Sequence, residues 1–429
     1  MLHIENQFIK EHLLDGNFGL EKESLRVLSN GHFSHTPHPF PDDPHIVRDF
    51  SENQIEINTG VHDSIDGALA ELKQHSKRVE ETIAALPEKE YLWPFSNPPY
   101  IKNELDIPIA QFQGEQAEKT VYREHLSRRY GRYKMTFSGI HFNFSFSEEL
   151  LKAGYEMDPE AEGLSLQEYK NRLYLSLAKR LSVYGWILVP ITAASPILDS
   201  SFMEKGVYDS DIFTGMSSVR CSEMGYWNEF TPIFNYESID HYADSIQRYV
   251  DDGTLMAPSE LYYPIRLKTE GINSLPALKE KGASHIELRM FDLNPFAEGG
   301  VDPRDIRFAH LMIVWLACAP DESISLNDQV HAVQNFKNAA RYDLKTVYMY
   351  DETGDSYSFV TASKIIIERM RMFFRPLGID VNELLDFEYE KFEHAENRYS
   401  WRMRKEFGNG FVKKGLAFVT EEPAKEADG

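Results

Sequence analysis

Alternation of apolar and polar residues is the feature that most limits how this chain can fold. The segment 141–146, HFNFSF, puts three phenylalanines on one side and His141, Asn143 and Ser145 on the other. Because successive side chains of a β-strand point to opposite faces, the segment predicts a strand with one buried face and one polar face. We predict further strands of this kind at 18–27, 54–58 and 285–290.

Helices, and not tight hairpins, separate these strands. The 3.6-residue apolar period and the terminal residues predict helices at 64–86 with Asp63 as a cap, 166–189 ending at Pro190, 306–319 after Asp302-Pro303, and 382–407 ending at Gly408. We therefore predict an α+β fold, with a mostly antiparallel sheet that is covered by helices on one face and polar on the other.

Composition limits the organisation and the partners. The chain has 429 residues and no glycine- or proline-rich linker, so we predict one catalytic unit at 1–420 and a disordered acidic tail at 421–429. The formal net charge of −23 argues against nucleic acid or anionic membrane as partners. The N-terminus lacks a long apolar core, and the most apolar stretch, 311–320, is far below the roughly 20 residues that span a bilayer. We expect a soluble, cytoplasmic protein.

The polar strand faces carry acidic residues, which strands otherwise disfavour. A common face can collect Glu21, Glu23, Glu56, His141 and Glu287, and Asp49 lies just before the strand at 54–58. Taken singly, each of these faces is most simply a wet surface. Together, such carboxylates repel one another unless a cation joins them, and oxygen ligands with one imidazole suit magnesium or manganese. Several carboxylates suggest more than one ion, as in sites that clamp a nucleotide triphosphate.

Arginines form the second component of the predicted site. Arg289 shares a strand face with Glu287, so its guanidinium could hold phosphate next to a metal. Arg123 and Arg220 carry a weaker signal, since a lone arginine is more often a surface ion pair. The segment 407–415 contains glycines followed by two lysines, which fits either a phosphate contact or a helix cap.

Other chemistries are poorly represented in the sequence. The chain has no GxxxxGK[ST] loop, no GxGxxG after a strand, no HExxH and no GxSxG. Cys221 and Cys318 are better explained as buried small apolar residues than as nucleophiles or a disulfide framework.

A series of segments resembles bacterial glutamate–cysteine ligase (γ-glutamylcysteine synthetase). They include GLEKESLRV at 19–27, WPFSNP at 93–98, SGIHFNF at 138–144, LYYPIR at 261–266 and IELR at 286–289. Asp49-Phe50 with Glu56, Tyr122-Arg123-Glu124, and the stretch 218–226 also match. The matches run in one order over roughly residues 18 to 310, which is far more specific than a single motif.

The resemblance implies a curved antiparallel sheet similar to the glutamine synthetase catalytic domain, and it implies roles for individual residues. Magnesium ligands would be Glu21, Glu23, Asp49, Glu56, His141 and Glu287. Arg289 would contact phosphate, Arg123 and Arg220 a substrate carboxylate or phosphate, with Arg289, Glu287 and Arg123 at the chemistry. The cysteine side chain would lie among Phe50, Tyr122, Leu126, Tyr226 and Tyr262, although ordinary core packing explains Phe50 and Leu126 equally well. The match weakens after Ala319, where Arg341 and Arg402 are the candidates for nucleotide contact.

The implied activity joins the γ-carboxylate of L-glutamate to the amine of L-cysteine. ATP would activate glutamate as γ-glutamyl phosphate, in the first step of glutathione biosynthesis, and the chain would stop at the dipeptide. Two alternatives stay open: a γ-glutamyl ligase with another amine acceptor, and a non-catalytic regulatory homologue. The sequence leaves the choice between monomer and homodimer, feedback inhibition and metal preference undetermined.

Overall fold

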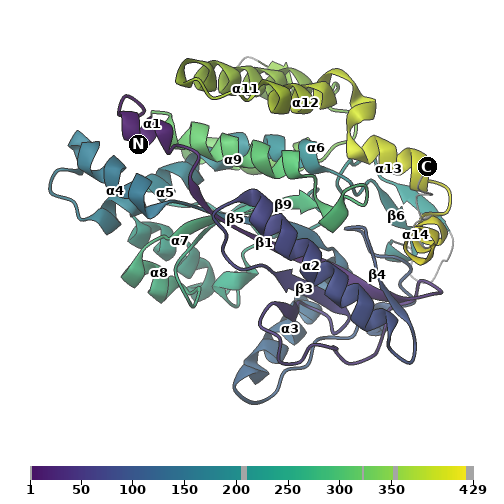
Figure 1. Ribbon diagram of the computed structural model, residues 1–429. Coiled ribbons are helices and arrows are strands. Elements are labelled where there is room, and N and C mark those ends of the chain that lie inside the picture. The colour runs from purple at the N-terminus through teal and green to yellow at the C-terminus, as the bar shows by residue number, and fades with distance from the viewer. Residues whose placement is uncertain (1, 204–209, 321–322, 351–355, 422–429) are drawn as a thin grey trace.

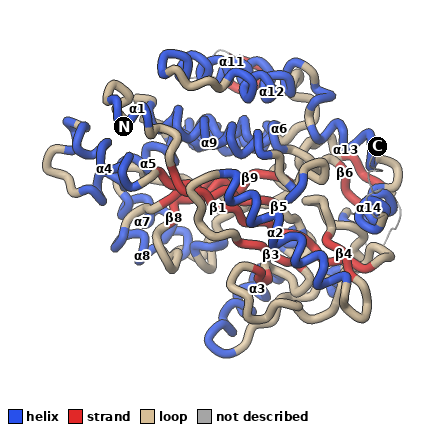
Figure 2. The backbone as a smooth tube through the Cα atoms, viewed as in Figure 1, coloured by secondary structure: helices blue, strands red, loops and turns tan. Residues whose placement is uncertain are grey.

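One seven-stranded antiparallel sheet forms the centre of the computed structural model, which describes residues 2–203, 210–320, 323–350 and 356–421 (Figures 1 and 2). Its strand order is β2-β3-β1-β5-β9-β8, and β4 pairs with the far end of β1. These strands are β1 Gly16–Leu28, β2 Ile46–Arg48, β3 Gln54–Asn58, β4 Glu90–Leu92, β5 Gly139–Phe146, β8 Ile265–Lys268 and β9 His285–Asp292. Two small ribbons pair β6 Ile197–Asp199 with β7 Asp211–Phe213, and β10 Tyr348–Tyr350 with β11 Ser356–Ser358.

Helices cover the sheet and extend beyond it (Figure 1). They are α1 Gln7–Glu11, α2 Ile65–Ala84, α3 Ala117–Tyr130, α4 Glu148–Met157, α5 Leu166–Tyr184, α6 Leu188–Thr192, α7 Ile239–Asp251, α8 Leu275–Lys281, α9 Pro303–Cys318, α10 Leu326–Ala339, α11 Phe359–Phe374, α12 Asn382–Glu393, α13 Tyr399–Phe407 and α14 Phe411–Thr420. Figure 1 shows α11 and α12 as an outer layer above α9. Within the described residues, no helix combines the length and the apolar content needed to cross a membrane.

The apolar face of the sheet makes the main core. Phe142, Phe144 and Phe146 of β5 are at most 2% exposed. The ring of Phe144 packs against Phe18 of β1 and, at 4.9 Å between centroids, against His310 of α9. The predicted mixture of helices with an antiparallel sheet is confirmed, as are the four alternating strands.

Helix starts follow local capping chemistry. Asp302 caps α9 as predicted, with its side chain accepting a hydrogen bond from the Arg304 amide. The predicted cap at Asp63 is wrong, because Ser64 holds that position on α2 and accepts from the Gly67 amide.

The predicted helix at 166–189 is shorter than expected. α5 ends at Tyr184, a turn of 3-10 helix follows at Gly185–Ile187, and α6 then contains Pro190. Proline is tolerated there because the first turn of a helix leaves its amides unbonded within the helix. Pro190 is therefore part of a new helix and does not end the old one.

The predicted helix at 382–407 is broken between α12 and α13. His394 and Arg398 have extended backbones, with ψ of 101° and 140°. In an unbroken helix Lys391 and Tyr399 would be about 12 Å apart along the axis. The break lets both reach Asp305 of α9, at 2.7 Å and 3.2 Å. The predicted tail, 421–429, falls outside the described residues except for Glu421.

Candidate active site

The polar face of the sheet lines a cavity of about 280 Å³. Fourteen of the residues predicted for the site line it: Glu21, Glu23, Asp49, Phe50, Glu56, Tyr122, Arg123, Leu126, His141, Arg220, Tyr226, Tyr262, Glu287 and Arg289. Residues that are spread from position 21 to position 289 of the sequence are thus brought to one place.

Strand register explains how the acidic residues meet. Glu21 of β1 pairs with His141 of β5, and Glu23 of β1 pairs with Glu56 of β3. Glu287 of β9 pairs with Asn143 of β5, two residues after His141. Since all of these side chains point to the same face, four neighbouring strands build one cluster.

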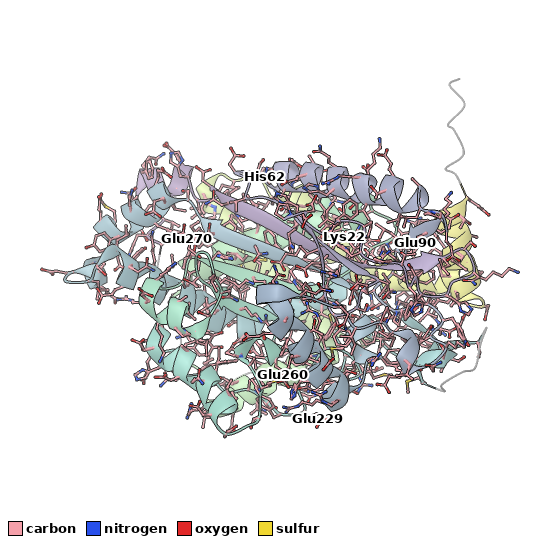
Figure 3. All side chains as sticks on the ribbon, turned by 90° about the horizontal axis from the view of Figure 1, so that it is seen from below. Lys22, His62, Glu90, Glu229, Glu260 and Glu270 are labelled. Atoms are coloured by element: carbon pink, nitrogen blue, oxygen red, sulfur yellow. The ribbon has the colours of Figure 1, made fainter. Side chains whose placement is uncertain are left out.

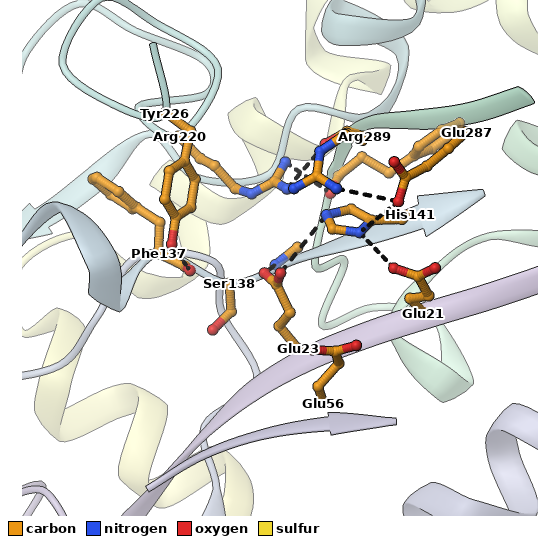
Figure 4. A network of polar contacts seen from close by, with 12 residues as sticks. Glu21, Glu23, Glu56, Phe137, Ser138, His141, Arg220, Tyr226, Glu287 and Arg289 are labelled. Carbon is orange, nitrogen blue, oxygen red and sulfur yellow. Dashed lines mark hydrogen bonds and ion pairs between the residues drawn. The ribbon is translucent and has the colours of Figure 1, made fainter. Parts of the chain in front are cut away.

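His141 is at the centre of the cluster (Figure 4). Its Nδ1 lies 2.9 Å from Glu21 Oε2 and 3.6 Å from Glu287 Oε1, and its Nε2 lies 3.7 Å from Glu23 Oε1. Asn143 donates to Glu21 Oε1 at 3.0 Å, and the Gly139 amide donates to Glu23 Oε2 at 2.9 Å. The carboxylates are therefore held by neighbours and do not move freely.

Two neighbouring carboxylates, those of Glu23 on β1 and Glu56 on β3, are electrostatically frustrated. Burial, together with Asp49 and Glu21, raises the pKa of Glu56 to about 8. Burial and Asp49 likewise raise the pKa of Glu23 well above its usual range, although Arg220 partly opposes them. Close acidic groups without enough positive charge raise each other's pKa in this way, and a bound cation would remove the conflict.

On the β8–β9 side, by contrast, nearby positive charges stabilise the ionised carboxylate. Burial alone would raise the pKa of Glu287, but the positive charges of Arg289 and Lys268 hold it well below its usual range. Arg289 Nη1 lies 3.1 Å from Glu287 Oε1, and Lys268 Nζ lies 3.4 Å from the same oxygen. β9 bulges between Leu288 and Phe291 where it pairs with β5, and Arg289 lies inside that irregularity. Such bulges re-aim side chains next to functional sites.

Two further arginines frame the cavity. The guanidinium of Arg220 donates to the carbonyls of Arg289 and Phe291 and packs directly on Gly139, where a Cβ atom would collide with it. Arg123, on α3, donates from Nε to the Asp49 carbonyl at 2.5 Å. Both guanidinium groups are thereby fixed in position.

Sequence reasoning missed two of the five cationic residues that line the cavity, Arg266 and Lys268 of β8. Their i, i+2 spacing in the alternating stretch IRLK was the signal that could have identified them. With them, five carboxylates face five cations. The cavity therefore has a balanced set of charges, although the chain as a whole has a formal net charge of −23.

Aromatic side chains make the apolar wall. The ring centroids of Tyr226 and Tyr262 are 5.5 Å apart, and Tyr130 packs on Tyr262 at 5.6 Å. Behind them the buried Glu260, labelled in Figure 3, accepts a 2.8 Å hydrogen bond from the Tyr130 hydroxyl. Sequence reasoning missed Glu260, and no pattern in the chain marked it.

The two residues predicted to contact the nucleotide do not line this cavity. Arg341 pairs with Glu223 at 3.2 Å, and Arg402 pairs with Glu406 and stacks on Phe296. In the glycine-rich stretch, the amides of Gly410 and Phe411 donate to Asp211 at 2.7 and 2.9 Å. An internal carboxylate thus occupies the position that a phosphate would take there.

The donor set fits a hard divalent cation. Three side chains, those of Glu21, His141 and Glu287, each offer one ligand atom, and these three atoms lie within 4.8 Å of one another. His141 Nε2 and Glu287 Oε2 are buried without a hydrogen-bond partner among the described residues. Burial and Arg289 lower the pKa of His141, which keeps the imidazole neutral and able to bind a metal.

Comparisons with known proteins agree with this geometry. Residues 1–339 match the family model described as Glutamate-cysteine ligase. The glutathione biosynthesis bifunctional protein GshAB of Listeria monocytogenes serotype 4b (strain F2365) is 34% identical over 417 residues, which cover 94% of this chain and 53% of that protein. The chain thus spans about half the length of the curated relatives that it matches.

Solved structures show the same fold. A bifunctional glutathione synthetase from Pasteurella multocida superposes with a TM-score of 0.82 at 26% identity, over 97% of this chain and 53% of that one. A glutamate–cysteine ligase from Francisella tularensis, solved in complex with AMP, superposes with a TM-score of 0.84 at 22% identity, over 94% of this chain and 87% of that one. The family match extends over more than three quarters of the residues and includes every strand that lines the cavity, so the chain belongs to the glutamate–cysteine ligase family.

Proposed function

We propose that this protein joins the γ-carboxylate of L-glutamate to the amine of L-cysteine with ATP, the first step of glutathione biosynthesis. The observation that carries the proposal is the single cavity in which five carboxylates and His141 face five cationic side chains, in a chain of this family. A carboxylate and an amine do not condense in neutral water, so the carboxylate must first be activated. ATP phosphorylates it to γ-glutamyl phosphate, and the amine then displaces inorganic phosphate.

Magnesium is the proposed cofactor. Its ligands would be Glu21, Glu23, Asp49, Glu56, His141 and Glu287, and the raised pKa values of Glu23 and Glu56 support a cation there. When bound, the ion neutralises charge on the phosphates.

The cationic side chains orient the reacting groups. Arg289 stabilises charge on the transferred phosphoryl group, and its ion pair with Glu287 keeps the guanidinium directed into the cavity. Arg123 and Arg220 bind carboxylate or phosphate groups, and each is already fixed by backbone carbonyls. Little reorganisation is then needed when substrate binds.

The apolar wall binds the amine substrate. Phe50 and Leu126 are buried at its base, and Tyr122, Tyr226 and Tyr262 are beside them. This wall matches a small, weakly polar side chain such as that of cysteine, and it excludes water that would hydrolyse the acyl phosphate. An apolar pocket separates isosteres by only about 1–3 kcal/mol.

We also propose five details that the sequence predicts and that go beyond family membership. They are a curved sheet like that of the glutamine synthetase catalytic domain, a single unit at 1–420, a cytoplasmic location, manganese as a substitute for magnesium, and nucleotide contacts by Arg341 and Arg402. For these two arginines, nucleotide contact would require them to leave the pairings described above.

The direct test is phosphate release from ATP with Mg²⁺ and glutamate, with each amino acid added separately and the product identified by mass. Release that needs both glutamate and cysteine, with formation of the γ-linked dipeptide, is the expected result. Preference for another amine would keep the chemistry and change the acceptor. No release with any amine, from folded protein that binds magnesium, would overturn the proposal in favour of a non-catalytic role.

A further inference from the structure

A second cluster of metal-ligating side chains lies outside the cavity, where helix α2 meets the edge of the sheet. The cluster consists of His45, Glu71 and His75, which each offer one ligand atom, and these three atoms lie within 4.8 Å of one another. His45 directly precedes the edge strand β2, whereas Glu71 and His75 are one turn apart on α2. His62, labelled in Figure 3, follows β3 and contacts Glu71 through Nε2 at 2.5 Å.

The hydrogen bonds of His45 prepare it as a ligand. Its Nδ1 lies 2.9 Å from the Asn58 carbonyl oxygen, which can only accept, so Nδ1 carries the proton. In the neutral imidazole Nε2 then keeps its lone pair, and no hydrogen bond to Nε2 is found among the described residues. Histidines that bind metals almost always donate their other N–H to a carbonyl or carboxylate in this way.

Glu71 and His75 complete the set. Glu71 Oε2 accepts from the Gly60 amide at 2.7 Å, and Oε1 lies 3.3 Å from His75 Nε2. The ring of His75 stacks on that of His45 with centroids 5.2 Å apart, and its Nδ1 is buried without a partner among the described residues. If Glu71 only stabilised the loop after β3, this role would explain its contacts with His62 and with the Gly60 amide. It leaves unexplained why two imidazoles stack beside it.

We propose that His45, Glu71 and His75 form a second metal site, one that takes a divalent transition ion such as Zn²⁺. Two imidazoles with one carboxylate select zinc-like ions, whereas the cavity, with one imidazole and five carboxylates, selects harder ions. Zinc bonds of about 2 Å draw the three side chains inward by small torsional changes. The fourth position is filled by His62 or by water.

The bound ion fixes α2 to the edge of the sheet. His45 belongs to the loop before β2, so one ion bridges elements separated by 26 to 30 residues in sequence. The Asn58 carbonyl that orients His45 belongs to β3, and the Asn58 side chain donates to Glu56 in the cavity. The inference does not depend on the proposed ligase activity.

The test counts zinc per chain. The full-length protein is stripped with a chelator, returned to buffer with millimolar Mg²⁺ to saturate the cavity, and titrated with Zn²⁺ against a chromogenic competitor. His45→Gln and His75→Gln should each lose one tight zinc ion, with affinity at that site falling by at least about 100-fold. Zinc should raise the melting temperature of the wild type and leave that of these two variants unchanged.

His394→Gln is the matched control. His394 follows the last residue of α12 and lies 3.6 Å from Glu390, four residues before it, so the pair repeats the sequence spacing of Glu71 and His75 without a second imidazole. This variant should bind zinc as the wild type does. Metal-free melting curves that coincide for all variants show that folding is not the cause of any loss.

Two results overturn the proposal. One is an equal zinc count in the wild type, His45→Gln and His75→Gln, including a count of zero in all three. The other is a tight zinc ion that disappears in His141→Gln and persists in His75→Gln, because that ion would belong to the cavity.

Discussion

The two faces of the central sheet are made by the same strands, yet they differ in almost every physical respect. On one face, Phe142 and Phe144 of β5 are almost completely buried among other apolar side chains. On the other, His141 of the same strand is surrounded by carboxylates whose charges are only partly compensated. The first face stabilises the fold, and the second stores unfavourable electrostatic energy that a bound cation would relieve. Substitutions on the two faces should therefore have separable effects.

The largest effect is expected on the apolar face. Phe144→Ala removes a ring that packs on Phe18 and His310 and leaves a cavity, which should cost about 3–5 kcal/mol in the free energy of unfolding. Denaturant unfolding measures this cost. Molecules that remain folded should keep the specific activity of the wild type, and a loss of turnover in fully folded variant would show that the faces are not separable.

On the polar face, Glu21→Gln should do the reverse. Glutamine keeps the shape that contacts His141 and Asn143 but removes the charge of a proposed metal ligand. Turnover should fall by at least about 100-fold, since even residues that only hydrogen-bond to metal ligands contribute about 10–100-fold. The melting temperature should stay near that of the wild type. Unchanged turnover with normal magnesium dependence would remove Glu21 from the metal site.

The stored electrostatic energy should appear as a pH dependence of the metal-free protein. The pKa of Glu56 is raised to about 8 in the folded state from an ordinary value near 4.3, so the folded state binds the proton more tightly. The resulting stability is fully present below about pH 4 and is lost as the pH rises towards 8. The melting temperature should therefore fall across this range, and Glu56→Gln should flatten the fall. Equal slopes in both proteins would contradict the assignment of the frustration to Glu56.

The smallest effect is expected at the apolar wall of the cavity. The Tyr262 hydroxyl has only the Met135 sulfur, 3.7 Å away, as a described partner, and a thioether is a weak acceptor. Tyr262→Phe should change kcat/KM for cysteine by less than about 1 kcal/mol, or about fivefold. A much larger loss would mean that the hydroxyl contacts substrate and that the wall takes part in recognition by hydrogen bonding.

Alternation made the sheet and the acidic part of the cavity lining predictable, because strand facing is a local property of the sequence, whereas the aromatic wall was predicted only from the family resemblance. Glu21, Glu56 and Glu287 could be assigned to one face before any strand order was known. The break between α12 and α13 could not be predicted, since it depends on the reach of Lys391 and Tyr399 to Asp305, on a helix far away in sequence.

The residues of the site that the sequence failed to predict, or predicted wrongly, have similar explanations. Lys268 was visible in the alternation of β8, but its importance depends on the register, which pairs it with His285 and lets its side chain reach Glu287 diagonally. Glu260 lies in a short 3-10 turn without periodicity, so only the tertiary structure reveals its bond to Tyr130. Arg341 and Arg402 came from a region where the resemblance had faded, and they lie outside the cavity.

The central claim is that the polar face couples ATP cleavage to activation of glutamate. Glutamate labelled with ¹⁸O in its γ-carboxylate tests this directly, with the isotope followed into inorganic phosphate by mass spectrometry while the wild type turns over with Mg²⁺, ATP and cysteine. The account predicts one labelled oxygen in phosphate for each dipeptide formed, because the carboxylate oxygen attacks the γ-phosphorus and leaves with it. Dipeptide formation with unlabelled phosphate would contradict the account.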